Sequence, residues 1–431
     1  MPDITEQILP RLQQYRLAGF DLGAEFIYPQ YDGLSILNIP DSVCRLLGAP
    51  ALAHGALRPE LLEHLGTETR KVIVVLVDAL ALHRLQRWLA QGDLPAWEAL
   101  SSVGVLAPLT SITPSTTSAA LTSLWTGRSA AEHGIVGYEM WMKEYGVVAN
   151  TILHAPILFK GDVGSLAKAG FEADKYLPWP TMGAHLAAHG ISTYVLQHSS
   201  ILDSGLSRMF FHQAKTSAFS TAAEMWVNLR RLLEKKKDER FYSWVYWGAV
   251  DHFAHHYGPD DERGQAEFIS FSRDFATFFL DKLSAAARAG ATVIHTAHHG
   301  AIHTPLNPHY ELSHHPNLVR RLHIFPTGEN RLAYFFIRPG QTEAVYEYLE
   351  RTWPNQFTLV DPLFAVEHGL FGPGEPHPRL LDRLGELMVI ARGQSFLWWS
   401  PAKENFLLGR HGGLNPQEML VPFLAARLDA L

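Results

Sequence analysis

The chain has 431 residues and a formal net charge of −7, with 47% hydrophobic and 18% charged residues. This composition supports a sizeable core and excludes global disorder, while the acidic balance argues against general nucleic-acid binding. A single cysteine, Cys44, excludes a disulfide framework and a cysteine-rich metal site. Because the chain contains 23 histidines, any metal chemistry is expected to use His and Asp ligands.

Neither a secretion signal nor a membrane helix is predicted. The N-terminal segment MPDITEQILPRLQQYR is polar and carries both signs of charge, without the apolar region of a signal peptide. No stretch reaches the roughly 18 to 20 apolar residues that a membrane helix needs. We therefore expect a cytoplasmic protein without membrane contacts. The sequence gives no indication of an oligomeric state.

From Lys71 onward, apolar runs alternate with helical patterns. KVIVVLVDAL, which begins at Lys71, has the pattern of a buried strand, and ALHRLQRWLA follows it as a helix. Further strands are expected at 103–106, 191–196, 242–250 and 291–297, the last three each preceded by a helix. This alternation predicts an α/β fold with a mostly parallel central sheet and helices on both faces.

The remaining segments suggest additions to that core. Residues 1–70 are rich in Pro and Leu and are expected to form an N-terminal extension packed on the main domain, which we place at 71–431. The stretches near 136–180 and 305–400 are rich in Pro, Gly, Trp and Tyr and are predicted to be cap insertions above the sheet. The second of them contains the strand-like runs LAYFFIR and ELMVIA.

Acidic residues and histidines follow three of the predicted strands. Asp78 follows the first strand, Asp251 follows the run YSWVYWGAV, and His298 and His299 follow ATVIHTA. In open α/β sheets, ligands bind at the carboxyl ends of the strands. An aspartate there can simply cap a helix, but three such strand ends together favour a functional site.

The segment DHFAHHYGPD contains a possible metal-ligand pair. Asp251 and His255 would share one face of a helical turn and could offer an oxygen and a nitrogen to a metal. His252 and His256 have the same spacing, so spacing alone leaves the choice of pair open.

Two further segments place reactive residues in turns. Residues 113–127, TPSTTSAALTSLWTG, predict a turn at Pro114 and a short helix from Ser118 that ends at Gly127. A hydroxyl at this helix N-terminus is either an N-cap or a nucleophile beside a phosphate site. Near the C-terminus, RHGG places His411 in a Gly-rich turn, either as a structural residue or where the backbone approaches a ligand.

Taken together, VDAL, TTSAALTSLWTG, DHFAHHYGP, AHHG and HGG resemble, in this order, the motifs of the alkaline phosphatase superfamily. They are most similar to its type I phosphodiesterase/nucleotide pyrophosphatase branch, over roughly residues 72–425. The resemblance implies an alkaline-phosphatase-like α/β fold and a threonine nucleophile. It also implies two zinc ions, with other divalent metals as an alternative.

The resemblance assigns roles residue by residue. Thr117 matches the nucleophile, with Thr116 and Ser115 as fallbacks. Asp251 and His255 match the D-x-x-x-H ligand pair, which favours His255 over its neighbour. The implied metal ligands are Asp78, Thr117, Asp251, His255, His298, His299 and His411.

Two positions depart from the family pattern. The motif A-D-H-G reads Ala297-His298-His299-Gly300 here, so that an imidazole replaces a carboxylate and makes the site more positive. Nitrogen ligands favour zinc over magnesium or manganese. The phosphate-contacting asparagine of the family is Tyr138 here, whose hydroxyl could donate to a phosphate oxygen and so contact the substrate.

The resemblance implies a zinc-dependent hydrolase of phosphate esters. The leading interpretation is a phosphodiesterase or nucleotide pyrophosphatase that acts on a small phosphorylated substrate, such as a nucleotide, through a phospho-threonine intermediate. A phosphomonoesterase or phosphonate hydrolase is an alternative, but a monoester dianion needs an extra cation, and only Arg128 and Arg410 lie within the motifs. A non-catalytic member that binds a phosphorylated ligand or a partner protein is a third interpretation, supported by the AHHG change.

Three aromatic residues of the first predicted cap insertion leave one more alternative open. Trp141, Tyr145 and Trp179 either stack on a nucleobase or simply pack within the cap.

Overall fold

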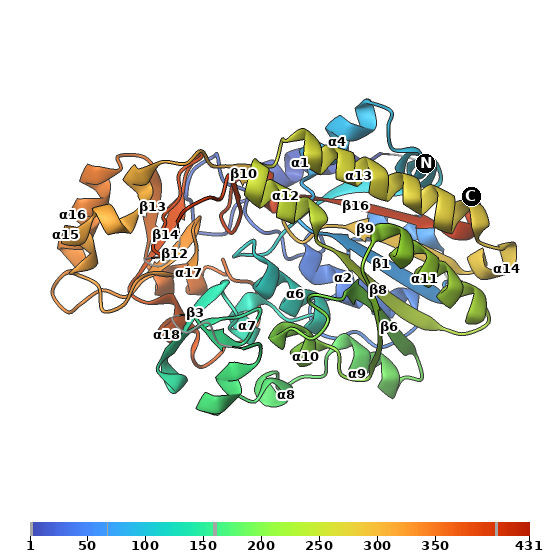
Figure 1. Ribbon diagram of the computed structural model, residues 1–431, viewed down its shortest axis with the longest axis horizontal. Coiled ribbons are helices and arrows are strands. Elements are labelled where there is room, and N and C mark those ends of the chain that lie inside the picture. Colours follow the sequence, from blue (N-terminus) through green and yellow to red (C-terminus); the bar gives the residue numbers. More distant parts are fainter. Residues whose placement is uncertain (1–2, 67, 158–161, 401–403) are drawn as a thin grey trace.

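The computed structural model describes residues 3–66, 68–157, 162–400 and 404–431, and its core is a seven-stranded sheet of order β2-β16-β9-β1-β8-β6-β7. Strand β16 is antiparallel to both of its neighbours, and the other pairings are parallel. The predicted α/β fold with a mostly parallel sheet is therefore confirmed (Figure 1). The strands are β1 (Lys71–Val77), β2 (Val105–Thr110), β6 (Ser192–His198), β7 (Ala214–Phe219), β8 (Phe241–Trp247), β9 (Ala291–Thr296) and β16 (Leu420–Arg427).

Helices cover both faces of this sheet. Every residue of β1, β2, β8 and β9 is buried, as expected for strands that are rich in apolar residues on both faces. One layer contains α4 (Leu82–Ala90), α5 (Pro95–Val103), α11 (Ala222–Lys235), α12 (Ala249–Tyr257) and α13 (Glu262–Asp274). The opposite layer contains α2 (Ile39–Leu46), α6 (Thr117–Thr126), α9 (Met182–Ala188) and α10 (Gly205–Phe210).

Two predicted strands have different bounds in the structure. The strand expected at 103–106 is shifted, because α5 continues to Val103 and β2 continues through Pro108, a residue that weakens a local strand pattern. The strand expected at 242–250 was too long. It ends at Trp247, and α12 begins at Ala249, so Asp251 lies in the first turn of a helix and does not end a strand.

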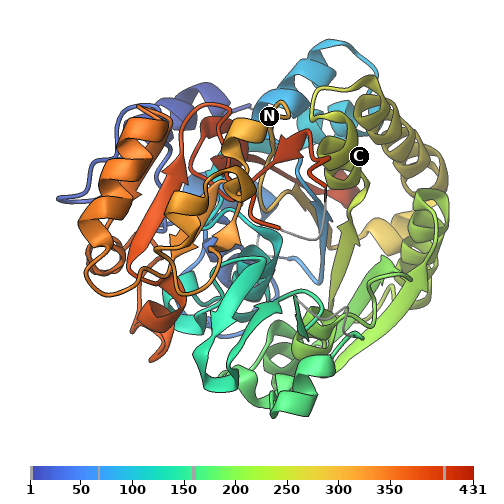
Figure 2. The same ribbon diagram turned by 60° about the vertical axis from the view of Figure 1, so that its left-hand side comes forward.

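A second seven-stranded sheet stands beside the first and is antiparallel throughout. Three of its strands come from one of the Pro- and aromatic-rich stretches and four from the other, and the pair Gly328–Glu139 joins them. Figure 2 shows the teal and orange strands of this cap sheet at one side of the core. The strands are β3 (Glu139–Met142), β4 (Val147–Asn150), β5 (Ala155–Pro156), β11 (Thr327–Glu329), β12 (Leu332–Phe335), β13 (Phe357–Val360) and β14 (Leu387–Ala391).

The N-terminal segment lies against the central sheet. Helix α1 (Thr5–Gln14) packs on β2, and β-bridges join Asp3 to Leu106 and Ser35 to Thr110. The remaining helices are α3 (Pro59–Leu62), α7 (Ala130–His133), α8 (Ala173–Tyr176), α14 (Ala285–Arg288), α15 (Pro316–Val319), α16 (Thr342–Thr352), α17 (Pro362–Glu367), α18 (Leu380–Leu384) and α19 (Pro416–Met419). Within the described ranges, no helix has the length and apolar character needed to cross a membrane.

A buried ion pair links the cap sheet to the central sheet. Arg331 lies in the turn between β11 and β12, and Glu418 lies in α19, directly before β16. The guanidinium donates to both carboxylate oxygens, from Nη2 at 2.8 Å and from Nε at 3.2 Å, and both side chains are fully buried. Glu418 also accepts hydrogen bonds from the backbone N–H groups of Gly413 and Asn415. The pair therefore fixes the loop between β15 (Gly409–Arg410) and α19.

Replacing Glu418 by Gln should strongly destabilise the protein, because it leaves the buried Arg331 guanidinium without a counter-charge. We expect Glu418→Gln to lower the free energy of unfolding by about 3–5 kcal/mol, measured by chemical denaturation. The control is Glu60→Gln, which removes the exposed ion pair with Arg11 and should leave the free energy of unfolding unchanged within error. Equal effects of the two substitutions would contradict the structural role of the buried pair.

Candidate metal centre and active site

The seven residues proposed as metal ligands from the sequence lie together at the carboxyl edge of the central sheet. They come from the ends of β1 and β9, from α12, from the first residue of α6 and from the turn after β15. They form two adjacent clusters. The Asp78 group consists of Asp78, Thr117, His298 and His299, and the Asp251 group consists of Asp251, His255 and His411.

The Asp78 group surrounds a single carboxylate oxygen. Asp78 Oδ1 lies 3.3 Å from His298 Nε2 and 3.4 Å from His299 Nε2. Thr117 Oγ1 lies 3.3 Å and 3.2 Å from the same two nitrogens. His298, which stands where the family has an aspartate, therefore turns its imidazole nitrogen toward both the aspartate and the threonine hydroxyl.

The Asp251 group lies directly beside it. His255 Nε2 is 3.3 Å from Asp251 Oδ2, and His411 Nε2 is 3.8 Å from Asp251 Oδ1. The rings of His411 and His299 stack with centroids 3.7 Å apart. Asp251, His299 and His411 also offer ligand atoms within 4.8 Å of one another. His299 of the Asp78 group therefore adjoins the Asp251 group.

The structure separates the two histidine pairs that spacing alone left open. His255 faces Asp251 within the cluster. His256 instead stacks on His252, with ring centroids 4.3 Å apart, and lies against Phe406. Both His252 and His256 are solvent-exposed, which places this second pair on the outer face of α12.

The three hydroxyls before α6 have different neighbours. Ser115 Oγ donates to the carbonyl of Gly413 at 2.7 Å, and Thr116 Oγ1 donates to Glu329. Thr117 alone among these three directs its hydroxyl to the histidines of the Asp78 group. The two fallback positions thus have structural partners.

Helix α6 begins beside this hydroxyl. Thr116 has an extended backbone, Thr117 is the first helical residue, and Gly127 ends the helix in the left-handed conformation at φ +65°. The first N–H groups of a helix lack helical partners and carry partial positive charge. An anion near Thr117 would therefore meet a favourable field.

Hydrogen bonds to the backbone orient three of the imidazoles. The Nδ1 atoms of His255, His299 and His411 lie 2.8, 2.9 and 3.2 Å from the carbonyl oxygens of Gly409, Gly300 and Ser115. A carbonyl can only accept, so each Nδ1 carries the hydrogen and each Nε2 keeps a lone pair toward the cluster in the neutral ring. The Asp78 carboxylate is oriented by a side chain, since the Tyr246 hydroxyl donates a hydrogen bond to Asp78 Oδ2.

Burial keeps most of these imidazoles neutral. It lowers the pKa of His298 to about 3 and that of His411 to about 4, and lowers the pKa of His299 well below its ordinary value. Burial also raises the pKa of Asp78, together with the charge of Asp251. Burial alone would lower the pKa of His255, but the negative charge of Asp251 outweighs burial and raises this pKa to about 9.

The donor set fits divalent cations. Within the described residues, Asp78 Oδ1 and Asp251 Oδ1 are buried and accept no hydrogen bond. A buried carboxylate oxygen without a partner is costly, and a cation would satisfy it. Imidazole nitrogens with carboxylate oxygens are the ligands that zinc takes in catalytic sites, and two such groups lie side by side here.

The family model for type I phosphodiesterase / nucleotide pyrophosphatase matches residues 72–414. The chain belongs to this family. Its members hydrolyse phosphate esters and depend on metals, and the resemblance seen in the sequence motifs is confirmed. No curated protein matches the chain in a comparison of sequences.

Solved structures of the alkaline phosphatase superfamily share the fold of this phosphodiesterase-family protein. Murine ectonucleotide pyrophosphatase / phosphodiesterase 5 has a TM-score of 0.56 at 20% identity, covering 82% of this chain and 87% of its own. An inactive variant of that murine protein in complex with AMP has a TM-score of 0.56 at 19% identity, covering 83% and 87%. Phosphonoacetate hydrolase from Sinorhizobium meliloti 1021, in complex with phosphonoformate, has a TM-score of 0.60 at 19% identity, covering 83% and 90%.

The cap aromatics have partners of their own. Tyr145 packs edge-on against Phe171, with ring centroids 5.9 Å apart, and the Arg128 guanidinium lies 4.9 Å above the Trp179 ring. Trp141 is partly buried against the main core. These contacts favour ordinary packing of the three rings.

Sequence reasoning missed Glu329, which comes from β11 of the cap sheet. Glu329 Oε1 accepts hydrogen bonds from Thr116 Oγ1 and, at 2.9 Å, from the backbone N–H of Tyr138. Its Cβ packs against Gly412, where φ is +109° and any side chain would overlap with Glu329. The carboxyl thus touches the neighbours of both Thr117 and His411. No motif contains it, because its position depends on the register of the cap sheet.

Tyr138 lies at the edge of the site. Its side chain is 37% exposed and interacts with Asn150, while its backbone N–H is held by Glu329. The predicted contact between the Tyr138 hydroxyl and phosphate therefore stays a prediction.

The ionisation of Glu329 should make stability depend on pH. Burial raises the pKa of Glu329 from 4.5 to about 7. Between these pH values the folded protein keeps a proton that the unfolded chain has lost, so the free energy of unfolding falls as the pH rises. In metal-free protein, we expect the wild type to lose about 2 kcal/mol of unfolding free energy relative to Glu329→Gln between pH 5 and pH 8. Chemical denaturation of both proteins across this range measures the difference. Parallel stability curves would contradict the raised pKa.

Proposed function

We propose that this protein is a zinc-dependent phosphodiesterase that hydrolyses small phosphate diesters, including nucleotide derivatives, with Thr117 as nucleophile. One observation carries the proposal. The Thr117 hydroxyl lies within 3.3 Å of two imidazole nitrogens of the Asp78 group, at the N-terminus of a helix. A hydroxyl in this position adjoins both a metal site and an anion site.

The residues of the two groups would hold one zinc ion each, with Thr117 among the ligands of the first. Bound zinc would supply Lewis acidity at the phosphate and favour the ionised form of the threonine hydroxyl. His298 fits this role because its imidazole is neutral at pH 7, which leaves a nitrogen lone pair available.

The protein's own atoms account for the remaining steps. Thr117 Oγ1 attacks phosphorus in line, the bond between phosphorus and the leaving oxygen breaks, and the proton of the threonine hydroxyl ends on the leaving oxygen, so that a phospho-threonine forms. Water then attacks the same phosphorus, the bond between phosphorus and Oγ1 breaks, and a proton from water restores the Thr117 hydroxyl. The N–H groups of the first turn of α6 would stabilise the non-bridging oxygens in both steps, because they lack helical partners and carry partial positive charge.

The two arginines near the motifs support a diester substrate. Arg410 donates to Thr304 at 2.6 Å and to Asn405 at 2.5 Å, and its guanidinium stacks 3.8 Å from the ring of Phe396. Arg128 donates to Glu132 at 3.0 Å. Both cations therefore have structural partners. A monoester carries one more negative charge than a diester, and neither arginine is placed to neutralise it.

The ligands of the structural neighbours are consistent with this substrate class. AMP occupies the murine nucleotide pyrophosphatase / phosphodiesterase variant, and phosphonoformate occupies the phosphonoacetate hydrolase. Both ligands are small and carry a tetrahedral phosphorus group. We extend that class, a small molecule with a phosphoryl group, to the present protein.

Removing the Thr117 hydroxyl should abolish diester hydrolysis. With zinc added, the wild type should cleave bis-p-nitrophenyl phosphate faster than p-nitrophenyl phosphate, and Thr117→Ala should lower kcat by about 10³-fold or more. Release of p-nitrophenolate measures both rates. The matched control is Thr122→Ala, which removes a buried hydroxyl of the same helix that donates to the carbonyl of Ser118 at 2.7 Å.

The outcomes separate the candidate functions. Full activity of the Thr117→Ala variant would exclude Thr117 as the nucleophile. Preference of the wild type for the monoester would favour a phosphomonoesterase. Zinc binding without turnover of either ester would favour a non-catalytic protein that binds a phosphorylated ligand.

A further inference from the structure

A cavity of about 100 Å³ opens beside the Thr117 hydroxyl. Thr117, Leu121 and Trp125 line it at successive turns of α6, because residues four apart share one face of a helix. The cavity therefore lies along this face of α6. The first residue along its length is the proposed nucleophile.

The opposite wall connects the cavity to the metal centre. Trp244 and Tyr246 are alternate residues of β8, so their side chains leave the same face of the sheet. Tyr246 also donates its hydroxyl to Asp78. One end of the cavity is thus bounded by two residues, Thr117 and Tyr246, that belong to or contact the Asp78 group.

Aromatic rings close the other end. Trp125 is 1% exposed and packs against Phe210, Phe211 and Trp244, with ring centroids 6.2, 5.0 and 5.5 Å away. Helices α6 and α10 pack against each other here. These rings form one part of the wall of the cavity.

The polar atoms in the wall bond to one another. Gln197 Nε2 donates to Ser207 Oγ at 2.9 Å and to the carbonyl of Ile201 at 3.1 Å, and Ser204 Oγ donates to Ser207 Oγ at 2.9 Å. Among the described residues, those that line the cavity include no Asp, Glu, Lys, Arg or His. The cavity therefore has no partner for a charged group and favours an apolar occupant.

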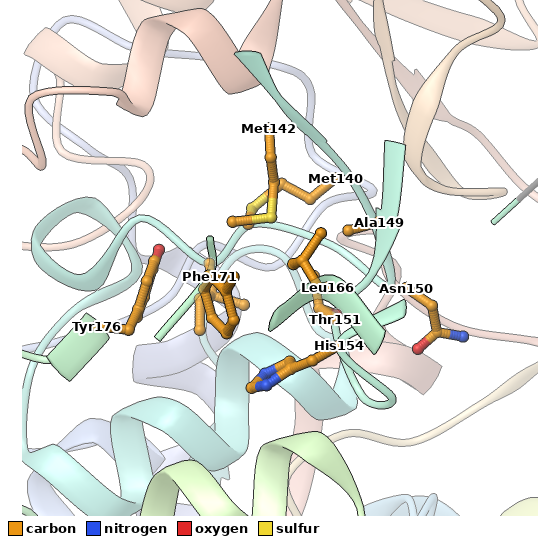
Figure 3. Close-up of a pocket in the computed structure, with 10 residues that line it drawn as sticks. Met140, Met142, Ala149, Asn150, Thr151, His154, Leu166, Phe171 and Tyr176 are labelled. Carbon is orange, nitrogen blue, oxygen red and sulfur yellow. The ribbon is translucent and has the colours of Figure 1, made fainter. Parts of the chain in front are cut away.

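Another cavity, in the cap, does not offer such space. Figure 3 shows Met140, Leu166 and Phe171 among the residues that line it. Its volume is about 10 Å³, which is at the lower limit for one water molecule. The cavity at Thr117 is thus the larger of the two by far and the one beside the reactive residues.

The volume limits the size of an occupant. An apolar protein cavity of about 150 Å³ holds benzene, with six carbon atoms. In proportion, about 100 Å³ holds about four non-hydrogen atoms, which is roughly half the number in the smallest nucleobase. The lining and the volume together select a short alkyl group.

We propose that this cavity is a subsite for a short, uncharged alkyl substituent on the phosphorus of the substrate, about four carbon atoms long. The inference rests on the proposed function, because it takes Thr117 as the residue that meets phosphorus. It defines the substrate as an alkyl phosphodiester or alkylphosphonate ester. A nucleoside, if present, occupies the solvent side of the site as the leaving group.

Two chain-length series test the subsite separately from the chemistry. The first is hydrolysis of p-nitrophenyl alkyl phosphates with methyl, ethyl, butyl and octyl groups by the zinc-loaded full chain. The second is calorimetric binding of the monomethyl esters of methyl-, butyl- and octylphosphonic acid, which carry a single negative charge as a diester does and need no turnover to be measured. We expect kcat/KM and affinity to rise about fourfold per methylene up to butyl and to fall at octyl.

Substitutions at Leu121 should move the optimum in opposite directions. Leu121 is half-buried, so a larger side chain can be accommodated there. Leu121→Trp fills the cavity and should abolish the gain from methyl to butyl, whereas Leu121→Ala enlarges it and should shift the optimum beyond butyl. The control is Leu381→Trp on α18, where the side chain is 46% exposed, and it should leave the chain-length profile unchanged.

The two series distinguish failure of the subsite from failure of the proposed function. Chain-length-dependent binding without hydrolysis would overturn the phosphodiesterase activity and support the subsite. Hydrolysis or binding that is independent of chain length, absence of any phosphonate binding, or profiles that do not respond to Leu121 would overturn the subsite.

Discussion

Two carboxylates constrain the whole site, because each has one buried oxygen that accepts no hydrogen bond from the described residues. Asp78 and Asp251 lie among imidazoles that burial keeps mostly neutral, so the protein supplies lone pairs where it would need positive charge. His255 is the exception, because the charge of the adjacent Asp251 raises its pKa to about 9. Cations would complete such an arrangement, so we expect metal binding to stabilise the fold.

Residues of the cap sheet hold parts of this site in place. Arg331 and Glu418 fix the loop that carries His411, and Glu329 reaches from the neighbouring strand to the residue before Thr117. A shift of the cap would therefore move the nucleophile and one ligand together. The alkyl subsite lies on the other side of Thr117, within the core, so the cap and the core each bound a different part of the substrate.

Sequence patterns predicted the parts of the site in which a strand and its functional residues are neighbours in the chain. The apolar run before Asp78 and the histidines after β9 could be placed because strand and ligand are adjacent in sequence. Strand β16 was not predicted, since Pro422 within it contradicts the pattern of an internal strand. The pairing of Gly328 with Glu139, and with it Glu329, depends on contacts between distant segments that have no local signature.

We infer that the Asp78 group and the Asp251 group each hold one metal ion. Anomalous diffraction from crystals soaked in zinc, recorded above and below the zinc absorption edge, tests this inference most directly. We expect two peaks, one within the Asp78 group and in contact with Thr117, and one within the Asp251 group. A single peak, no peak, or peaks outside these groups would contradict it.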